Sequence, residues 1–149
     1  MIRQIKESDR DEFFSMSKLM YLSEAVDHNV PQSHHVRTFE ELMKSDIYAE
    51  AYIFEYDGNI AGYALIAKTF SREAGGMVIW IDELYVKEEY RGKGLGSEFF
   101  AYIEKNRPQN TARLRLEVED YNIRAIELYK KMGYEFLEYK QMIKDFSLS

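Results

Sequence analysis

Residues 80–100 read WIDELYVKEEYRGKGLGSEFF, and this stretch decides the fold. An apolar segment, Met77 to Val86, predicts a strand, and a charged turn, Lys87 to Tyr90, follows it. The glycine loop, Arg91 to Gly96, then opens a helix. The first turn of a helix leaves backbone N–H groups without intrahelical acceptors, and the helix dipole favours an anion in front of them. This order of elements predicts a phosphate-binding site.

The glycine loop carries three glycines and two cations. Gly92, Gly94 and Gly96 have no Cβ, so successive N–H groups can converge on one pyrophosphate. Arg91 and Lys93 add positive charge. A plain strand, turn and helix with solvated cations is the alternative interpretation, because a glycine pattern alone is weak evidence.

Two common nucleotide motifs do not fit the glycine loop. A Walker loop needs Ser or Thr after its lysine, whereas Lys93 precedes Gly94. A dinucleotide fingerprint needs a third glycine where Phe99 stands.

The bulk composition indicates one globular domain, residues 1–149, with 46% hydrophobic and 15% aromatic residues. Cysteine is absent, which excludes disulfides and thiolate metal sites. No apolar run approaches the roughly 20 residues of a membrane span, and the N-terminus lacks a signal-peptide core, so we expect a cytoplasmic protein without membrane contact. The net charge of −6 disfavours nucleic acid as a partner and suits cationic small molecules, although solubility alone accounts for such a charge.

The N-terminal third predicts a strand and two helices. Ile2 to Lys6 alternates like a short strand, and Ser8 or Asp9 can cap a helix that runs to about Ala25. We expect its apolar residues to be core: Phe13, Met16, Leu19, Met20 and Leu22.

A polar loop, Asp27 to His35, contains all three histidines, but its spacing does not suit a metal, and we predict no metal site. Thr38 and Glu41 have capping-box spacing, which predicts a second helix over Phe39 to Ser45.

Asp57-Gly58-Asn59 is turn chemistry between two strand-like segments, Ala51 to Tyr56 and Ile60 to Ala67, and predicts a hairpin. Residues 71–76 interrupt the chain before the central strand. After the glycine loop a helix is expected to reach Asn106, where Arg107-Pro108 stops it.

A strand over Ala112 to Glu119 completes a βαβ unit, so it should lie parallel to Met77 to Val86. Ligands in such sheets bind beyond the C-terminal strand ends, where the glycine loop is placed.

A second motif, NIRAIELYKKMGY at 122–134, predicts a helix that Asn122 caps and Gly133 ends. Asn122 and Tyr129 are seven residues apart and therefore share one face. An aromatic at helical spacing is usually core, so Tyr129 alone carries little weight. The final segment, Glu135 to Phe146, alternates weakly and predicts a closing antiparallel hairpin.

The pattern Arg91-x-x-Gly94-x-Gly96, together with Asn-x-x-Ala-x-x-x-Tyr-x-x-x-Gly-Tyr at 122–134, resembles the GNAT superfamily of N-acetyltransferases. The resemblance implies an α/β fold with a central mixed sheet of about six to seven strands, about four flanking helices and a splayed parallel pair at the cofactor site. It also implies acetyl-CoA as cosubstrate. The pyrophosphate would lie on the glycine loop, the pantetheine arm along the strand end, and Asn122 would hydrogen-bond that arm. The implied cofactor-binding residues are Leu84, Tyr85, Val86, Arg91, Gly92, Lys93, Gly94, Leu95, Gly96, Ser97 and Asn122.

The implied reaction is direct acetyl transfer to a primary amine, with no covalent enzyme intermediate. Tyr129 is the candidate acid for the leaving thiolate. Asp82 and Glu83 interrupt an apolar strand and are candidate bases, with Asp82 preferred by strand parity and Glu83 second if a bulge re-registers the strand. Carboxylates satisfied by a neighbouring group are the structural alternative.

The alternative function is an acetyl-CoA-binding regulatory module without turnover. The acceptor is expected to be a small-molecule or peptide amine, attracted by Glu24 and Asp27 beside the histidines, and a homodimer is a further expectation.

Overall fold

The computed structural model describes residues 1–23, 30–146 and 148. The chain divides into two compact units, Met1–Glu117 and Val118–Ser149. That the whole chain acts as a single domain stays a prediction.

A five-stranded mixed sheet forms the first unit, with its strands in sequence order. The first four strands pair antiparallel with their neighbours, and the last two pair parallel. The strands are β1 (Ile2–Gln4), β2 (Ala49–Tyr56), β3 (Asn59–Ser71), β4 (Gly76–Val86) and β5 (Thr111–Leu116). The mixed α/β class, the predicted βαβ unit and its parallel pair are confirmed.

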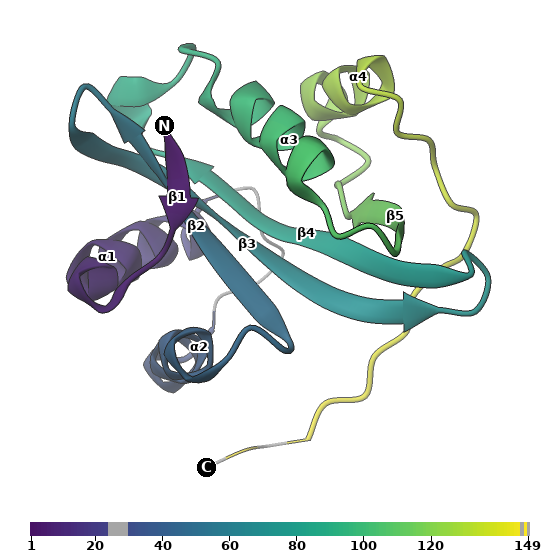
Figure 1. The fold of residues 1–149 in the computed structure, drawn as a ribbon, viewed down its shortest axis with the longest axis horizontal. Helices are drawn as coiled ribbons and strands as arrows, with labels where there is room; N and C mark the ends of the chain where they lie inside the picture. Colours follow the sequence, from purple (N-terminus) through teal and green to yellow (C-terminus); the bar gives the residue numbers. More distant parts are fainter. Residues whose placement is uncertain (24–29, 147, 149) are drawn as a thin grey trace. The chain divides into compact units, whose positions relative to one another are not determined.

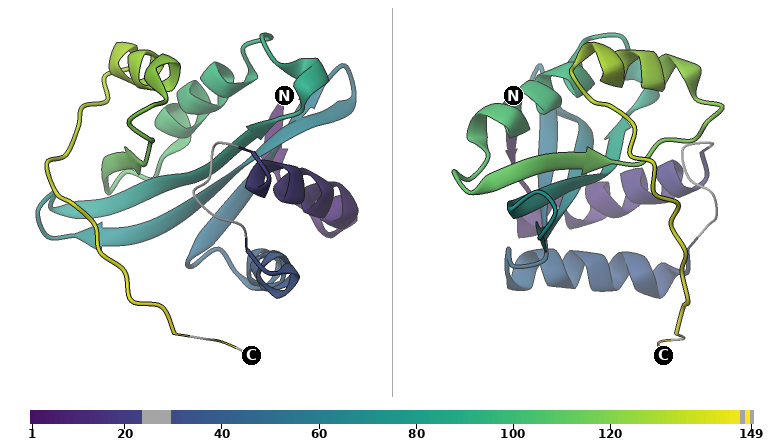
Figure 2. Two further views of the ribbon diagram at one scale, coloured as in Figure 1. Left: turned by 180° about the vertical axis from the view of Figure 1, so that it is seen from behind. Right: turned by 90° about the vertical axis from the view of Figure 1, so that its right-hand side faces the viewer.

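Helices cover both faces of this sheet (Figures 1 and 2). On one face lie α1 (Arg10–Tyr21), which follows the 3-10 turn η1 (Glu7–Asp9), and α2 (Gln32–Lys44). On the other face lies α3 (Leu95–Asn106), which the 3-10 turn η2 (Glu88–Tyr90) and the glycine loop precede.

Side chains alternate along the strands and form two hydrophobic layers, one on each face of the sheet. Tyr52 and Phe54 of β2 stand against Phe99 of α3, with ring centroids 5.8 and 5.6 Å away. Alternate residues of the same strands point to α1 and α2. That second layer consists of Phe13, Met16, Met20, Phe39, Ala51, Ile53, Tyr63 and Leu65.

The β2–β3 hairpin turns at Asp57 and Gly58, as predicted. Both residues have positive φ, 50° and 79°, and Tyr56 pairs with Asn59 across them. Two consecutive positive φ values match the right-handed twist of the flanking strands, which explains Asp-Gly at this position.

The two N-terminal helices differ from the sequence prediction. The first ends at Tyr21 rather than near Ala25, which lies outside the described residues. Leu19 and Leu22 are exposed and not core.

The predicted capping box at Thr38 and Glu41 is wrong. Helix α2 begins at Gln32, after Pro31 at the N-cap, and includes Thr38 in its interior. The Thr38 hydroxyl donates to the His34 carbonyl at 2.7 Å, so this side chain is satisfied inside the helix and marks no boundary. Four residues of the expected polar loop, 32–35, are therefore helical, and His35 is buried.

Among its described residues, the second unit contains one helix, α4 (Ile123–Lys131), and an extended segment after it (Figure 1). The predicted hairpin over Glu135 to Phe146 is wrong, because these residues form no strand. An isolated two-stranded hairpin is at best marginally stable, and weak alternation does not specify a register. The described residues therefore form five strands, fewer than the six to seven expected.

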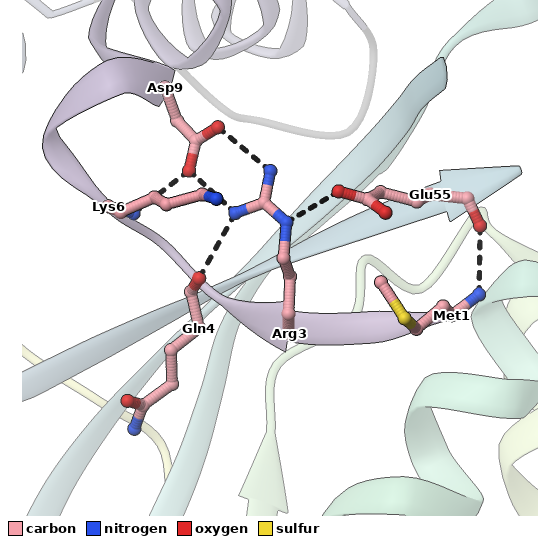
Figure 3. A network of polar contacts seen from close by, with 6 residues as sticks. All are labelled: Met1, Arg3, Gln4, Lys6, Asp9 and Glu55. Atoms are coloured by element: carbon pink, nitrogen blue, oxygen red, sulfur yellow. Dashed lines mark hydrogen bonds and ion pairs between the residues drawn. The ribbon is translucent and has the colours of Figure 1, made fainter. Parts of the chain in front are cut away.

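A buried ion pair ties the edge strand β1 to the start of α1 (Figure 3). Arg3 donates two hydrogen bonds to the Asp9 carboxylate, at 2.8 and 2.9 Å, and a third to Glu55 of β2. Asp9 also accepts from the Lys6 backbone N–H. The Arg3 guanidinium holds the pKa of Asp9 below its usual value. This network replaces the expected side-chain cap at Asp9.

We expect Arg3→Gln to lower the free energy of unfolding by about 3 kcal/mol, because it leaves the buried Asp9 carboxylate unpaired. Since the pKa of Asp9 is depressed in the folded state, the pair stabilises the fold above the unfolded pKa of about 4 and less as the pH falls below it. Urea titrations at pH 7 and pH 3 measure both effects. Arg113→Gln, which loses a more exposed pair with Glu73, is the control and should cost less than about 1 kcal/mol.

Candidate active site

Strand β4 carries a bulge at the two acidic residues. Leu65 of β3 pairs with Glu83, while the next residue, Ile66, pairs with Ile81. Asp82 is therefore the extra residue, and the side-chain alternation of β4 is interrupted there. This is the re-registration under which Glu83 becomes a candidate, and strand parity alone no longer selects Asp82.

Glu83 is buried on the face of the sheet that α1 covers, with 8% of its surface exposed. Tyr63 of β3 donates to its Oε1 at 2.6 Å, and Tyr21 of α1 donates to its Oε2 at 3.0 Å. Burial raises the pKa of Glu83, and the two tyrosine hydrogen bonds oppose that rise. Both carboxylate oxygens are thus occupied by protein donors.

Asp82 is exposed as a residue, whereas its neighbour Glu83 is buried. Nearby protein atoms nevertheless withdraw its carboxyl group partly from water. This desolvation, with the like charges of Glu83 and Glu117, raises the pKa of Asp82 to about 6. A carboxylate with this pKa can accept a proton near neutral pH and remain accessible to a substrate.

The parallel pair β4 and β5 separates at the same place. Its ladder runs from Met77 to Ile81, where Ile81 pairs with Leu116, while β4 continues to pair with β3 as far as Val86. The β5 side of residues 82–86 therefore lies beyond the ladder. Backbone N–H and C=O groups on that side can pair with an extended ligand.

Gly62 of β3 allows the close approach that this end of the sheet requires. A Cβ at Gly62 would collide with the Tyr85 carbonyl oxygen and lie 3.1 Å from the Val86 Cα. The position therefore admits only glycine without displacement of β4.

The glycine loop follows this strand end and leads into α3. Gly92 and Gly94 have φ values of 77° and 78°, and a Cβ built on either would meet no atom within 4 Å. Gly94 is the N-cap of α3, so the first N–H groups of the helix lack intrahelical acceptors. Open space before free N–H groups fits a diphosphate.

Both loop cations are held near the loop. The Arg91 Nε donates to the Val86 carbonyl at 3.0 Å, and the Lys93 ammonium lies 5.2 Å from the centroid of the Tyr56 ring. The Arg91 contact links the glycine loop directly to the last residue of β4.

The second motif forms α4 as predicted. The Asn122 Oδ1 accepts from the Ala125 N–H, and Gly133 has φ 96° just beyond the helix. The Asn122 cap uses only the side-chain oxygen, which leaves the amide nitrogen as a donor. Tyr129 contacts Tyr134 at 6.1 Å between ring centroids. Asn122 and Tyr129 belong to the second unit, so their role beside Asp82 stays a prediction.

The sequence analysis did not identify the two donors to Glu83, Tyr21 and Tyr63. It also missed the buried pair of Ser17 and His35. Glu83 pairs with Leu65 of β3, and Tyr63 stands two residues before Leu65, so its side chain lies on the same face of the sheet. Only the register of the strand pairing reveals this. Tyr21 was treated as part of an ordinary amphipathic helix, and His35 as part of a loop.

Comparison with known proteins places these features in a family. Residues 5–134 match the model of the acetyltransferase (GNAT) family. The chain is 30% identical over 151 residues to a thialysine N-epsilon-acetyltransferase from Bos taurus, covering 92% of this chain and 85% of the relative. It is 27% identical over 85 residues to the spermine/spermidine N(1)-acetyltransferase of Bacillus subtilis, covering 54% and 56%.

The fold also matches a solved structure, a possible acetyltransferase from Clostridium difficile 630, with a TM-score of 0.84. That match has 20% identity and covers 99% of this chain and 98% of the other.

The chain belongs to the GNAT acetyltransferase family. It is an N-acetyltransferase and therefore an acyltransferase. Acetyl-CoA is the cosubstrate of this family. The comparisons thus support the enzyme over a regulatory module without turnover. Within the described ranges, no helix is both long and apolar enough to cross a membrane.

Proposed function

We propose that this enzyme transfers the acetyl group of acetyl-CoA to a primary amine of a small molecule or peptide by direct attack. The observation that carries the proposal is the accessible Asp82 carboxylate at the β4 bulge, with its pKa raised to about 6, directly before the strand end that β5 leaves unpaired. The proposed base and the proposed binding edge for the cofactor therefore lie next to each other on β4.

The cofactor is assigned to the strand end and the glycine loop. Its diphosphate is expected on the N–H groups of the loop and of Leu95 to Ser97, with Arg91 and Lys93 supplying charge. Its pantetheine arm is expected along the backbone of Leu84, Tyr85 and Val86. The amide nitrogen of Asn122 is a further donor to that arm.

The residues of the chain have distinct proposed roles. Bound acetyl-CoA supplies an activated acetyl group. Asp82 takes a proton from the acceptor's ammonium group, directly or through water, so that the neutral amine can attack, and its raised pKa suits that transfer. Glu83 is the second choice for base, disfavoured because its two oxygens already accept from tyrosines.

Two donors complete the proposed chemistry. The Tyr129 hydroxyl is proposed to protonate or hydrogen-bond the departing sulfur, and the backbone N–H near Val86 to stabilise the polarised carbonyl.

The acceptor is proposed to be a cationic primary amine, for example a polyamine, an amino sugar or a lysine-like side chain. The negative charge of Asp82 and Glu83, and the net charge of −6, support this class. Thialysine and spermidine, the substrates in the names of two relatives, carry primary amines. Glu24 and Asp27, which the sequence analysis also invoked, lie outside the described residues.

We predict that Gly94→Asp abolishes the rise in Tm that acetyl-CoA produces. The substitution forces a side chain onto a residue with φ 78° and places a negative charge before the diphosphate. Differential scanning fluorimetry with and without acetyl-CoA measures the effect. Gly58→Asp, with a similar φ in the β2–β3 turn, is the control for strain. A preserved ligand-induced rise in Gly94→Asp would refute the placement of the diphosphate.

We predict that Tyr129→Phe lowers kcat about a hundredfold and leaves the Kd for acetyl-CoA nearly unchanged, because only the hydroxyl at the leaving sulfur is lost. Steady-state kinetics and calorimetry separate the two quantities. Tyr134→Phe, which contacts the same ring, is the matched control and should retain kcat. Equal kcat in Tyr129→Phe and wild type would remove Tyr129 from the chemistry.

We predict that kcat/KM for a diamine rises with pH through about 6 and then levels, since Asp82 must be deprotonated to act. Asp82→Asn should lose rate at neutral pH and recover partly at high pH, where the free amine is abundant. CoA release with a panel of amines, in a range of salt concentrations, provides the measurement. Turnover with neutral or anionic acceptors alone would exclude the cationic class. Full activity of Asp82→Asn, with Glu83→Gln inactive, would make Glu83 the base.

A further inference from the structure

Three buried polar residues on the same face as Glu83, Ser17, His35 and Tyr63, have no assigned part in the proposed chemistry. The Ser17 hydroxyl of α1 lies 2.8 Å from the Nδ1 of His35 of α2. The hydroxyl of Tyr63 donates to the Oε1 of Glu83 at 2.6 Å. All four residues are less than one tenth exposed.

The direction of the hydrogen bonds follows from counting protons. Tyr63 has one hydroxyl proton, and the charged carboxylate at 2.6 Å is a far better acceptor than the Met20 sulfur at 3.3 Å. The Tyr63 hydroxyl therefore donates its proton to Glu83.

The buried histidine of this group is neutral near pH 7. Burial and the charges of Lys18 and His34 lower the pKa of His35. Tyr21, the second donor to Glu83, stacks edge-on against the same imidazole at 5.6 Å between ring centroids. His35 therefore contacts α1 at two places, by the hydrogen bond with Ser17 and by ring packing against Tyr21.

We propose that Tyr63 and Tyr21 are positioning residues that keep Glu83 ionised beside Asp82, and that the fixed charge of Glu83 sets the strength of Asp82 as a base. The inference rests on the proposed function, in which Asp82 is the base. A buried carboxylate without donors would take up a proton, whereas two O–H donors stabilise the charged form. The bulge places that charge next in the chain to the carboxylate that must bind a proton.

Within the described ranges, three titratable groups interact with the Asp82 carboxylate. They are Glu83 of β4, Glu117 just after β5, and Tyr21 of α1, whose own pKa is raised by burial and by both carboxylates. Glu117 is more exposed than Glu83, so solvent screens its charge more strongly. Glu83 is therefore the dominant like charge, and its removal should make Asp82 a weaker base.

The test measures the Asp82 carboxyl pKa directly, by 13C NMR titration of the selectively labelled full-length protein. We expect the pKa to fall by about one unit in Glu83→Gln, which removes the like charge while keeping the shape of the side chain. Tyr63→Phe should shift it in the same direction, because Glu83 then keeps its proton to higher pH. The double variant should show no further fall beyond Glu83→Gln.

Tyr52→Phe is the matched control. Tyr52 is a buried tyrosine of β2 on the face covered by α3, and its loss of a hydroxyl should leave the Asp82 pKa unchanged. An Asp82 pKa that stays constant or rises in Glu83→Gln would overturn the proposal. If Tyr63→Phe fails to fold, Glu83→Gln alone still decides.

A kinetic readout distinguishes this proposal from the function on which it rests. The acidic limb of kcat/KM should move to lower pH in Glu83→Gln and Tyr63→Phe, in parallel with the NMR titration. Absence of CoA release by the wild type with every amine would refute the proposed acceptor class, while the NMR titration would still test the link between Glu83 and Asp82. If the acidic limb of the kcat/KM profile does not shift in Tyr63→Phe while its Tm falls, the tyrosine has only a structural role.

Discussion

The pairing of β4 with two unlike neighbours is the constraint on which the rest of the first unit depends. Against β3 the pairing runs along the full length of β4, from Gly76 to Val86. Against β5 it covers only the first half. Since unpaired backbone groups in a sheet need a partner, the second half of β4 has an edge that water or an extended ligand must satisfy. The bulge at Asp82 marks the beginning of that half.

The burial of Glu83 shows how the sheet combines stability with chemistry. A carboxylate inside a protein is costly unless donors satisfy it, and a core composed only of apolar residues could not hold one. Tyr63 and Tyr21 supply those donors from a strand and from a helix. The hydrophobic layer beneath α1 therefore has a polar centre. Asp82, one residue away, remains accessible, and the negative charge of Glu83 adds to the burial that raises the pKa of Asp82.

Family membership and the local geometry answer different questions. The family model and the similar proteins show what class of reaction the chain performs. They do not distinguish between adjacent carboxylates on one strand. The accessibility of Asp82, and the two tyrosine hydrogen bonds to Glu83, provide the physical basis for that choice. The proposed amine acceptor follows from the sign of the charge at this point in the sheet.

The sequence by itself determined the turns, helix ends and caps of this protein, because these depend on local backbone chemistry. The Asp57-Gly58 turn, the glycine loop, the stop at Pro108 and the Asn122 cap depend on backbone conformations that few residue types adopt, so the letters predict them. The order of strand, helix and strand also predicted that β4 and β5 are parallel, because such units form with a right-handed crossover.

Tertiary structure decided the features that need a distant partner. The bulge at Asp82 is a mismatch of register between β3 and β4, and no property of β4 alone reveals it. The early start of α2 and the burial of His35 depend on packing against α1, which outweighs the helix-start signal at Thr38. The expected strands after Glu135 are absent, because a strand forms only where a ladder partner completes its hydrogen bonds. Sequence therefore specified the turns and caps, whereas the environment of each carboxylate arose only when the strands and helices came together.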